Sequence, residues 1–302
     1  MASGSSNERP SVVSGYSTCG AAPGCTRRAM RPLVQIGATT VTYLPDGAVH
    51  ADPVALFPAT TAQDWASHRH LLDANGWLVA SVGSFLVRNG SGAALIDLGL
   101  GRINLEVRGV ATYEGGGLMG SLHAEGLPAA DIGLVLFTHL HRDHVGWTSD
   151  GIGRLTFPNA RHLVDRAEWD HWQSHTEAPG PDPQTVLAPL SPVVEFFGAQ
   201  SPAPGMQRVL APGHTPGHTS LLITDPASET RLLLLGDAFH TTAQLTAPHW
   251  QFRSDADPAL AAGHRLDLLS RSRADRTIIA GGHFAGHVFG SLDDDGRWTE
   301  EH

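Results

Sequence analysis

Four side chains that can bind a metal ion crowd into one short segment, FTHLHRDHVGW, residues 137–147. They are His139, His141, Asp143 and His144, and they follow the apolar run IGLVLF. Imidazoles and a carboxylate at the end of a buried run must be hydrogen-bonded, solvated or bound to a cation, so packing does not explain them. The chain has 18 histidines in 302 residues, and composition alone predicts only roughly 0.004 matches to H-x-H-x-D-H. The segment therefore predicts metal ligands.

Further histidines and an aspartate follow three later apolar stretches. His214 and His218 lie in APGHTPGHTS, Asp237 lies in LLLLGDAFH, and His283 and His287 lie in IIAGGHFAGHVFG. Each stands beside a run of strand length, where side chains from separate strands can converge on one edge of a sheet. Borderline divalent metals such as zinc accept neutral imidazole and carboxylate groups, and a catalytic site keeps one position open for water.

The candidate ligands are too many for one tetrahedral ion. The first segment offers four, and one histidine of the Gly-Pro turn, Asp237 and one histidine after the last apolar run bring the total to seven. Seven ligands suit two ions roughly 3.5–4 Å apart, bridged by a carboxylate and by a hydroxide that is nucleophilic near neutral pH. These residues indicate a dinuclear centre.

The elements that must position these residues are mostly strands. The first half of the chain alternates apolar stretches of strand length with turn signals such as PDG at residues 45–47, which predicts a β meander. In the second half, strands alternate with helices at about 166–175 and 257–273, the latter with Asp257 as its N-cap. Two groups of strands with interspersed helices predict an α+β fold, a sandwich of two mixed β-sheets flanked by helices, in a single domain spanning residues 31–302.

Composition narrows the function classes. The net charge is −10 and no basic cluster occurs, so nucleic acid is not the expected partner. All 20 basic residues are Arg, which excludes Schiff-base and P-loop lysines. No apolar run approaches the roughly 18 residues of a membrane helix. Residues 1–30 are rich in Ser, Gly and Pro and predict a disordered extension. A disulfide between Cys19 and Cys25 would not stabilise the folded core, because both lie in this extension. The chain therefore suits a reducing compartment, and we expect a cytoplasmic location.

The segments THLHRDH, PGHTPGH, LLGD and GGHF resemble the successive metal-binding motifs of the metallo-β-lactamase superfamily. The resemblance implies an αβ/βα sandwich with a dinuclear site at one edge. It further implies two zinc ions per chain, with manganese, cobalt or iron as alternatives. By this resemblance Asp97 orients the site without binding metal. The implied ligands are His139, His141 and His218 for the first ion, Asp143, His144 and His283 for the second, and Asp237 as the bridge.

Within the superfamily, FPNARHL and GHTPGHT resemble the branch of quorum-quenching lactonases and methyl parathion hydrolase. This branch implies a hydrolase that uses a metal-bridging hydroxide to cleave a lactone or carboxylic ester in a small-molecule substrate. Two alternatives remain open, a phosphotriesterase or phosphodiesterase and a metal-dependent binding protein without catalysis. Substrate choice is expected to depend on the loops around residues 45–75 and 240–256. Monomer and homodimer both remain open.

Two residues are expected to take part in catalysis. Asp143 can orient the hydroxide and carry a proton to the leaving group. His240 stands three residues after Asp237, where lactonases of the family have a Tyr that hydrogen-bonds the substrate carbonyl. Imidazole can donate the same hydrogen bond, and it would add a pH dependence near its ordinary pKa of about 6.5.

Other polar and aromatic residues near the motifs have simpler interpretations. His214 is expected to stabilise its turn, and His249 and His287 to lie in the pocket wall or at the surface. Four polar residues of the helix at 166–175 are expected to form its solvated face. Four aromatic residues could line an apolar pocket or pack in the core. The helix residues are Glu168, Asp170, His171 and His175, and the aromatic residues are Trp147, Phe239, Trp250 and Phe284.

Overall fold

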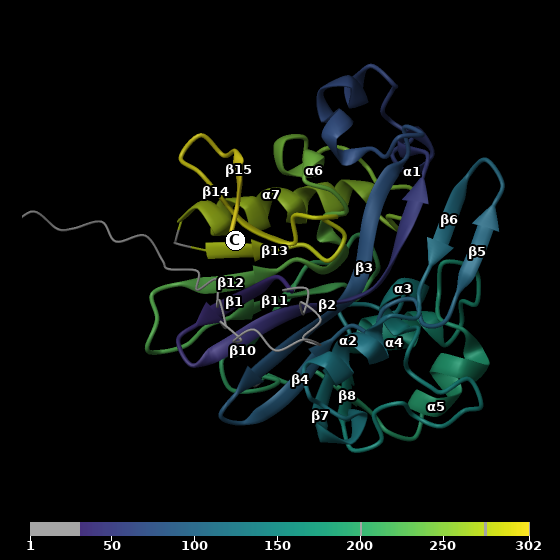
Figure 1. Ribbon diagram of the computed structural model, residues 1–302, viewed down its shortest axis with the longest axis vertical. Coiled ribbons are helices and arrows are strands. Elements are labelled where there is room, and N and C mark those ends of the chain that lie inside the picture. The colour runs from purple at the N-terminus through teal and green to yellow at the C-terminus, as the bar shows by residue number, and fades with distance from the viewer. Residues whose placement is uncertain (1–30, 200, 275–276, 302) are drawn as a thin grey trace, which may run out of the picture.

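The computed structural model describes residues 31–199, 201–274 and 277–301, and the predicted extension at 1–30, with Cys19 and Cys25, lies outside them. Two β-sheets pack face to face, and helices cover their outer faces (Figure 1). This arrangement confirms the expected sandwich of two mixed sheets.

The first sheet has nine strands in the described part of the chain, in the order β5-β6-β2-β3-β4-β7-β8-β9, with β1 paired to β2. β2, β3 and β4 are antiparallel neighbours, whereas β4, β7, β8 and β9 run parallel. The strands are β1 Leu33–Ile36, β2 Thr39–Ala51, β3 Leu78–Asn89, β4 Gly92–Ile96, β5 Asn104–Val107, β6 Ala111–Glu114, β7 Ile132–Leu136, β8 Arg161–Val164 and β9 Val194–Phe196.

The second sheet contains six strands in the described residues, in chain order from β10 to β15. Only β12 and β13 pair in parallel, and the helix α7, Pro258–Ala274, lies between them in the sequence. As predicted for its N-cap, the Asp257 carboxylate accepts a hydrogen bond from the Leu260 N–H at 3.0 Å. The strands are β10 Met206–Leu210, β11 Thr219–Ile223, β12 Arg231–Leu234, β13 Thr277–Ala280, β14 Phe289–Leu292 and β15 Trp298–Glu300.

Helices are short apart from α7. In Figure 1, α2, α4 and α5 lie on the outer side of the first sheet and α7 lies over the second. The α-helices are α1 Pro53–Leu56, α2 Leu118–Ala124, α3 Arg142–Val145, α4 Arg166–Trp172, α5 Ala188–Leu190 and α6 Ala243–Thr246. The 3-10 and π segments are η1 Asp64–Leu71, η2 Ala129–Asp131, η3 Pro183–Leu187 and η4 Gly236–Ala238.

The layers follow from the alternation of side chains along each strand. Leu232 and Leu234 of β12 are buried between the two sheets, whereas Leu233 and the following Leu235 pack against Leu268 of α7. Successive side chains of a strand point to opposite faces, so a continuous apolar run fills two cores. Full burial of such a side chain contributes about 1.5–3 kcal/mol. This packing fixes the strand ends from which the functional residues project.

The PDG segment is a β-bulge inside β2, where the sequence predicted a turn. The register shifts between Pro45 and Gly47, and the buried Asp46 carboxylate accepts a hydrogen bond from the Trp147 indole at 2.8 Å. A Cβ on Gly47 would lie 1.7 Å from a backbone oxygen of the neighbouring β6, so only glycine fits there. Four backbone N–H groups also donate to Asp46, those of Leu100, Gly101, Gly116 and Leu118. Tertiary hydrogen bonds thus override the local turn signal.

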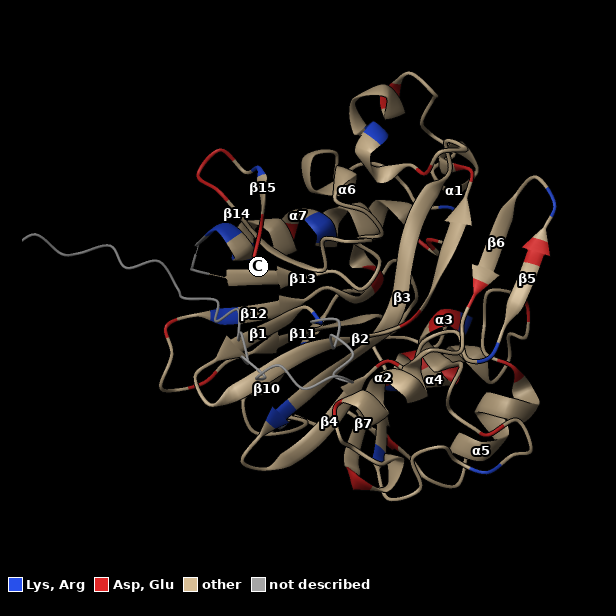
Figure 2. Ribbon diagram, in the orientation of Figure 1, with Lys and Arg blue, Asp and Glu red and all other residues tan. Residues whose placement is uncertain are grey.

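Within the described residues, no helix combines the length and the apolar character needed to cross a membrane. Figure 2 shows the Arg residues spread over many elements of the described ribbon, and no strand or helix carries an unbroken basic run. Acidic residues gather in the connection between β14 and β15.

Candidate metal centre

The predicted ligand segments meet at one edge of the sandwich. His139 and His141 follow β7, His214 lies between β10 and β11, Asp237 follows β12, and His283 follows β13. Parallel pairing of β12 with β13 brings their carboxyl ends to the same edge. The packing of the two sheets then sets that edge against the end of β7.

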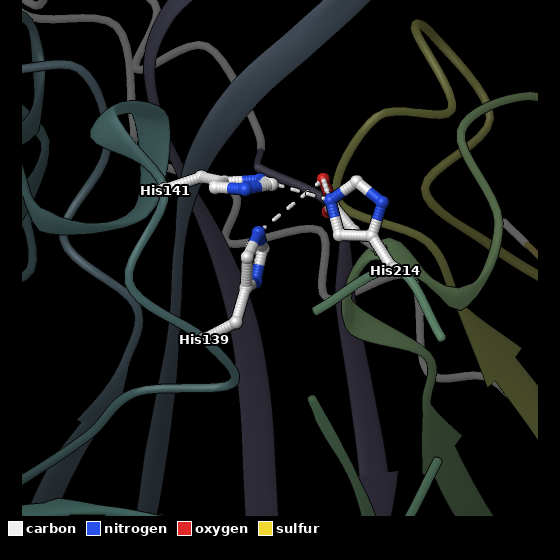
Figure 3. A group of neighbouring side chains, drawn as sticks. His139, His141 and His214 are labelled. Carbon is white, nitrogen blue, oxygen red and sulfur yellow. Dashed lines mark hydrogen bonds and ion pairs between the residues drawn. The ribbon is translucent and has the colours of Figure 1, made fainter. Parts of the chain in front are cut away.

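The first group of candidate ligands consists of His139, His141, His214 and Asp237, whose ligand atoms all lie within 4.8 Å of one another. Figure 3 shows the three imidazole rings pointing into a common space. Asp237 Oδ2 lies 3.7 Å from His139 Nε2 and 3.4 Å from His214 Nε2. His214 Nε2 lies 3.0 Å from His141 Nδ1. These residues can surround one cation.

The second group consists of Asp143, His144, Asp237 and His283, again within 4.8 Å. Asp237 Oδ1 lies 3.2 Å from His144 Nε2 and 3.1 Å from His283 Nε2. His283 Nε2 also lies 3.6 Å from Asp143 Oδ2. Asp237 belongs to both groups: its Oδ2 faces the nitrogens of His139 and His214, its Oδ1 faces His144, and His283 Nε2 lies within 3.2 Å of both oxygens.

The inner atoms of both groups fit metal ions better than they fit one another. His139 Nε2, His144 Nε2 and Asp237 Oδ1 are buried and make no hydrogen bond within the described residues. Buried polar atoms without partners cost free energy. A set of imidazole nitrogens and carboxylate oxygens is suited to zinc and similar divalent ions. The residues present therefore fit two divalent cations with a shared carboxylate.

Asp97 orients the second group, as expected from the sequence. Its Oδ2 lies 2.8 Å from His144 Nδ1 and accepts a hydrogen bond from the Thr138 hydroxyl, while its Oδ1 accepts one from the Thr138 N–H. Asp97 has a φ of +61°, which is uncommon outside glycine and costs backbone strain. The hydrogen bonds to Thr138 and His144 hold Asp97 in this strained conformation, and the contact with His144 Nδ1 turns His144 Nε2 toward Asp237.

The other histidines are held by their outer nitrogens as well. His283 Nδ1 lies 2.8 Å from the Ser81 carbonyl oxygen, and His214 Nδ1 lies 3.0 Å from Asp255 Oδ1. Such outer contacts fix the ring and its tautomer in metal sites. Neither Ser81 nor Asp255 was predicted from the sequence, because both belong to segments without a motif. The one sequence feature that could have indicated Asp255 is that it is a carboxylate in the loop before α7.

The structure places His218, predicted as a ligand of the first metal, outside both groups of candidate ligands. His218 Nδ1 donates to the Ala211 carbonyl at 3.0 Å, and its Nε2 accepts a hydrogen bond from the Asp237 N–H at 2.9 Å. Burial lowers the pKa of His218 to about 3, so the ring is neutral and can accept. His214, predicted as a turn residue, takes its place in the group. Gly236 has a φ of +56°, and a Cβ there would lie 2.7 Å from His218 Nε2.

Glu168 also differs from its prediction as part of a solvated face. It is fully buried, and its carboxylate accepts hydrogen bonds from the Leu140 N–H at 2.9 Å, the Trp172 indole at 2.7 Å and the Gly217 N–H at 3.1 Å. Leu140 lies between His139 and His141, and Gly217 lies in the turn that carries His214, so Glu168 ties α4 to both segments. Asp170 is exposed, as predicted for this face.

His240 lies beside the first group without belonging to it. It is buried, its ring stacks on Phe252 at a centroid distance of 3.5 Å, and its Nε2 lies 3.3 Å from Asp237 Oδ2. Burial lowers the pKa of His240 to about 4. The ring is therefore neutral at neutral pH, which contradicts the expected pH dependence near 6.5.

The carboxylates give the centre a surplus of negative charge. Burial alone would lower the pKa of His283, but Asp237 and Asp143 raise it to about 9. Burial would raise the pKa of Asp237, but the positive charges that His144 and His283 can carry hold it well below its ordinary value. A site of this charge attracts protons or metal cations, and the two compete for the same nitrogens.

A cavity of about 240 Å³ adjoins the second group. His283 and Thr241 line it on the metal side, and Leu71, Leu72 and Val79 give it an apolar wall. Phe284 and His287 also line it, whereas His249 is exposed. Both histidines were expected either in the pocket wall or at the surface. Trp147 and Phe239 are buried in the cores, and Trp250 packs against Phe57 and Trp65.

Comparison with known proteins places this chain in a family. The family model described as the metallo-beta-lactamase superfamily matches residues 79–283, more than half of the chain. The chain belongs to the metallo-beta-lactamase superfamily. N-acyl homoserine lactonase AttM of Azorhizobium caulinodans is 32% identical over 146 residues, 44% of this chain and 49% of that protein. The chain thus spans about half the length of this curated relative.

Three further matches, one curated relative and two solved structures, cover more of this chain. N-acyl homoserine lactonase AiiA of Bacillus thuringiensis subsp. kurstaki is 26% identical over 217 residues, 66% of this chain and 79% of that protein. The solved structure of AidC, a dizinc quorum-quenching lactonase, matches with a TM-score of 0.77 at 22% identity over 90% of this chain and 97% of that one. The hydrolase AbOPH matches with a TM-score of 0.74 at 24% identity over the same shares, 90% and 97%. At these identities the solved structures establish the fold.

Proposed function

We propose that this chain is a dinuclear-metal hydrolase that cleaves a lactone or carboxylic ester. The observation that carries the proposal is the Asp237 carboxylate, which is shared by two groups of inward-pointing ligands, three of whose buried atoms make no hydrogen bond within the described residues. The proposed ligands are His139, His141 and His214 for one ion, Asp143, His144 and His283 for the other, and Asp237 for both.

Zinc is the proposed metal, with manganese, cobalt or iron as alternatives. Imidazole and carboxylate donors suit all four, and the similar AidC structure is described as dizinc. When bound, two such ions lower the pKa of a shared water and polarise the bond to be cleaved. N-acyl homoserine lactones are the first substrates to test, because the relatives AttM and AiiA are named as lactonases of this substrate.

Asp143 and His240 are the proposed catalytic residues. The Asp143 side chain is 26% exposed and reaches His283 Nε2 at 3.6 Å, so it borders both the second group and the solvent. A carboxylate there can orient a water and pass its proton to the leaving group. The neutral His240 ring contacts Asp237 Oδ2 through its Nε2 at 3.3 Å, and its Nδ1 makes no hydrogen bond within the described residues. A ring in this position can donate a hydrogen bond to a substrate carbonyl oxygen.

The test is a panel of acyl homoserine lactones, aryl esters and aryl phosphotriesters assayed with the zinc-loaded protein. We expect lactones or carboxylic esters to be hydrolysed faster than phosphotriesters. A preference for phosphotriesters would replace the proposal with the alternative reaction at phosphorus. No hydrolysis of any class by zinc-loaded protein would leave a metal-dependent binding protein.

Variants separate the two catalytic roles from metal binding. Asp143→Asn is expected to lower turnover by roughly tenfold or more even when metal is restored. His240→Phe is expected to lower turnover with metal content intact, and His240→Tyr to retain more activity on lactones than His240→Phe. Asp170→Asn, at an exposed carboxylate of α4, is the matched control. Unchanged turnover in either Asp143→Asn or His240→Phe would contradict the role given to that residue.

A further inference from the structure

Arg265 of α7 is the largest side chain that is fully buried in the described residues. Its Nε donates to the Pro248 carbonyl at 2.7 Å, and its Nη1 lies 3.4 Å from both the Ala238 carbonyl and Asp255 Oδ2. A buried cation carries a large desolvation cost, and a buried ion pair is weak evidence for stability by itself. The position of Arg265 therefore calls for a role other than core stability.

The three acceptors of Arg265 belong to three different segments of the candidate metal centre. Ala238 follows Asp237, the shared carboxylate. Pro248 begins the segment that carries Phe252, whose ring stacks on His240. Asp255 lies next to His214 of the first group. One guanidinium thus joins a helix to a shared ligand, to a substrate-side loop and to a first-group histidine.

The contact through Asp255 is a continuous chain of polar groups. Asp255 Oδ1 lies 3.0 Å from His214 Nδ1, and Asp255 Oδ2 accepts a hydrogen bond from the Phe252 N–H at 3.1 Å and faces Arg265. The side chains of His214, Asp255 and Arg265 are 1% exposed or less. Solvent cannot replace any of these partners, so the orientation of the His214 ring depends on its contact with Asp255 and on that of Asp255 with Arg265.

We infer that Arg265 is a positioning residue for the first group of the metal centre, acting through Asp255 on His214. Its Nη1 contacts Asp255 Oδ2 at 3.4 Å, and this contact holds Asp255 in an orientation that turns His214 Nε2 toward Asp237. The contact with the Ala238 carbonyl holds the backbone after Asp237 in register with that ring. This inference rests on the proposed metal centre and needs no particular substrate.

The test measures zinc affinity with a chromophoric chelator in competition, on protein whose folding is checked by circular dichroism. Arg265→Met is expected to weaken the affinity for one of the two ions by roughly tenfold or more, in the range seen for outer partners of metal ligands. The affinity for the other ion is expected to stay near that of the wild type. Arg265→Lys, which keeps the charge without the fork, is expected to recover part of the loss. Arg271→Met, at an exposed arginine of the same helix, is the matched control.

A double variant tests whether the effect passes through Asp255. If it does, Arg265→Met combined with Asp255→Asn weakens zinc affinity by clearly less than the product of the two single effects. Fully independent effects would overturn the inference, as would wild-type zinc affinity in folded Arg265→Met. If Arg265→Met does not fold, Arg265→Lys and Asp255→Asn carry the same comparison, and wild-type affinity in both would overturn it.

The outcome for the wild type separates this inference from the proposed function. If wild-type protein binds fewer than two zinc ions, the dinuclear centre fails and this inference fails with it. If the wild type binds two ions and the Arg265 variants lose stability alone, the centre stands and Arg265 is a packing residue. The cobalt-substituted protein adds a spectroscopic signature, because a reoriented His214 changes the ligand-field bands of the ion it binds.

Discussion

Asp237 is the residue at which both candidate ligand groups meet. Its oxygens lie 3.1–3.4 Å from the Nε2 atoms of His144, His283, His214 and His240. Four imidazoles around one buried carboxylate would be a costly arrangement without a cation or protons between them. The geometry around this one residue is the strongest argument for a dinuclear centre.

The assignment of His214 over His218 leads to a direct prediction. His214→Ala is expected to lower the zinc content from about two to about one equivalent per chain, because it removes a ligand of the first group. His218→Ala is expected to retain more zinc, since that ring contacts backbone atoms of Ala211 and Asp237. Elemental analysis of both variants checks the difference. A lower zinc content in His218→Ala than in His214→Ala would restore the assignment made from the sequence.

His162 of β8 predicts a pH effect on stability away from the metal centre. It is fully buried, and burial lowers its pKa below 6.5. Below pH 6.5 the unfolded chain therefore takes up a proton that the folded protein does not, so the stability present above pH 6.5 is lost as the pH falls. The loss amounts to at most about 1.4 kcal/mol per pH unit.

The variant His162→Leu isolates this effect. Its melting temperature, relative to that of the wild type, is expected to rise steadily as the pH is lowered from 8 to 5. Thermal denaturation with chelator present keeps metal loss from contributing to the difference. Parallel curves for the two proteins across this range would mean that His162 does not titrate differently in the folded state.

At the scale of elements, the site depends on strand ends that α4 ties together. Glu168 of α4 accepts hydrogen bonds from Leu140, next to His139 and His141, and from Gly217, next to His218. A Cβ on Gly217 would lie 2.3 Å from the Glu168 backbone nitrogen, so the loop and the helix approach as closely as glycine permits. The helix therefore holds two segments that are far apart in the sequence.

Replacement of Glu168 tests this connection. Glu168→Gln keeps the shape of the side chain, but its amide has one acceptor oxygen where three N–H groups donate. We expect the metal-free protein to lose about 1–3 kcal/mol of stability and zinc to bind more weakly. Asp170→Asn on the exposed side of α4 is the control, measured by chemical denaturation and zinc competition. Equal stability and zinc affinity in Glu168→Gln and the control would contradict the connection.

The sequence allowed the prediction of elements and motifs where local pattern decides the structure. The ligand segments follow apolar runs, and continuous runs such as LLLLG fill two cores, so both were predictable. Sequence spacing could not show which of His214 and His218 faces the other ligands. The difference depends on tertiary contacts of His218 with the Ala211 carbonyl and with the backbone at Gly236. Asp46 and Glu168 were misassigned since their partners lie 54 and 28 residues away. Glu168 stands four residues before Trp172, on the same face of α4, and this spacing could have indicated that Glu168 is buried beside that indole.

At the scale of the whole molecule, the sandwich brings four separated segments to one edge. The core between the sheets contains side chains from both, including Leu134 of β7 and Leu234 of β12, and each lies shortly before a ligand segment. Packing of these strands thus sets the distance between the ends from which His139 and Asp237 project. The edge at which the candidate ligands meet is accordingly set by the packing of the two sheets, a fold that two solved structures match at TM-scores above 0.7.

The most direct test of the account is a zinc titration of chelator-stripped protein with lactone hydrolysis as the readout. The account predicts no hydrolysis without metal and a rise that reaches its plateau at about two equivalents of zinc per chain. A plateau at one equivalent would contradict the dinuclear centre. Full hydrolysis by the stripped protein would contradict the metal centre as the site of reaction.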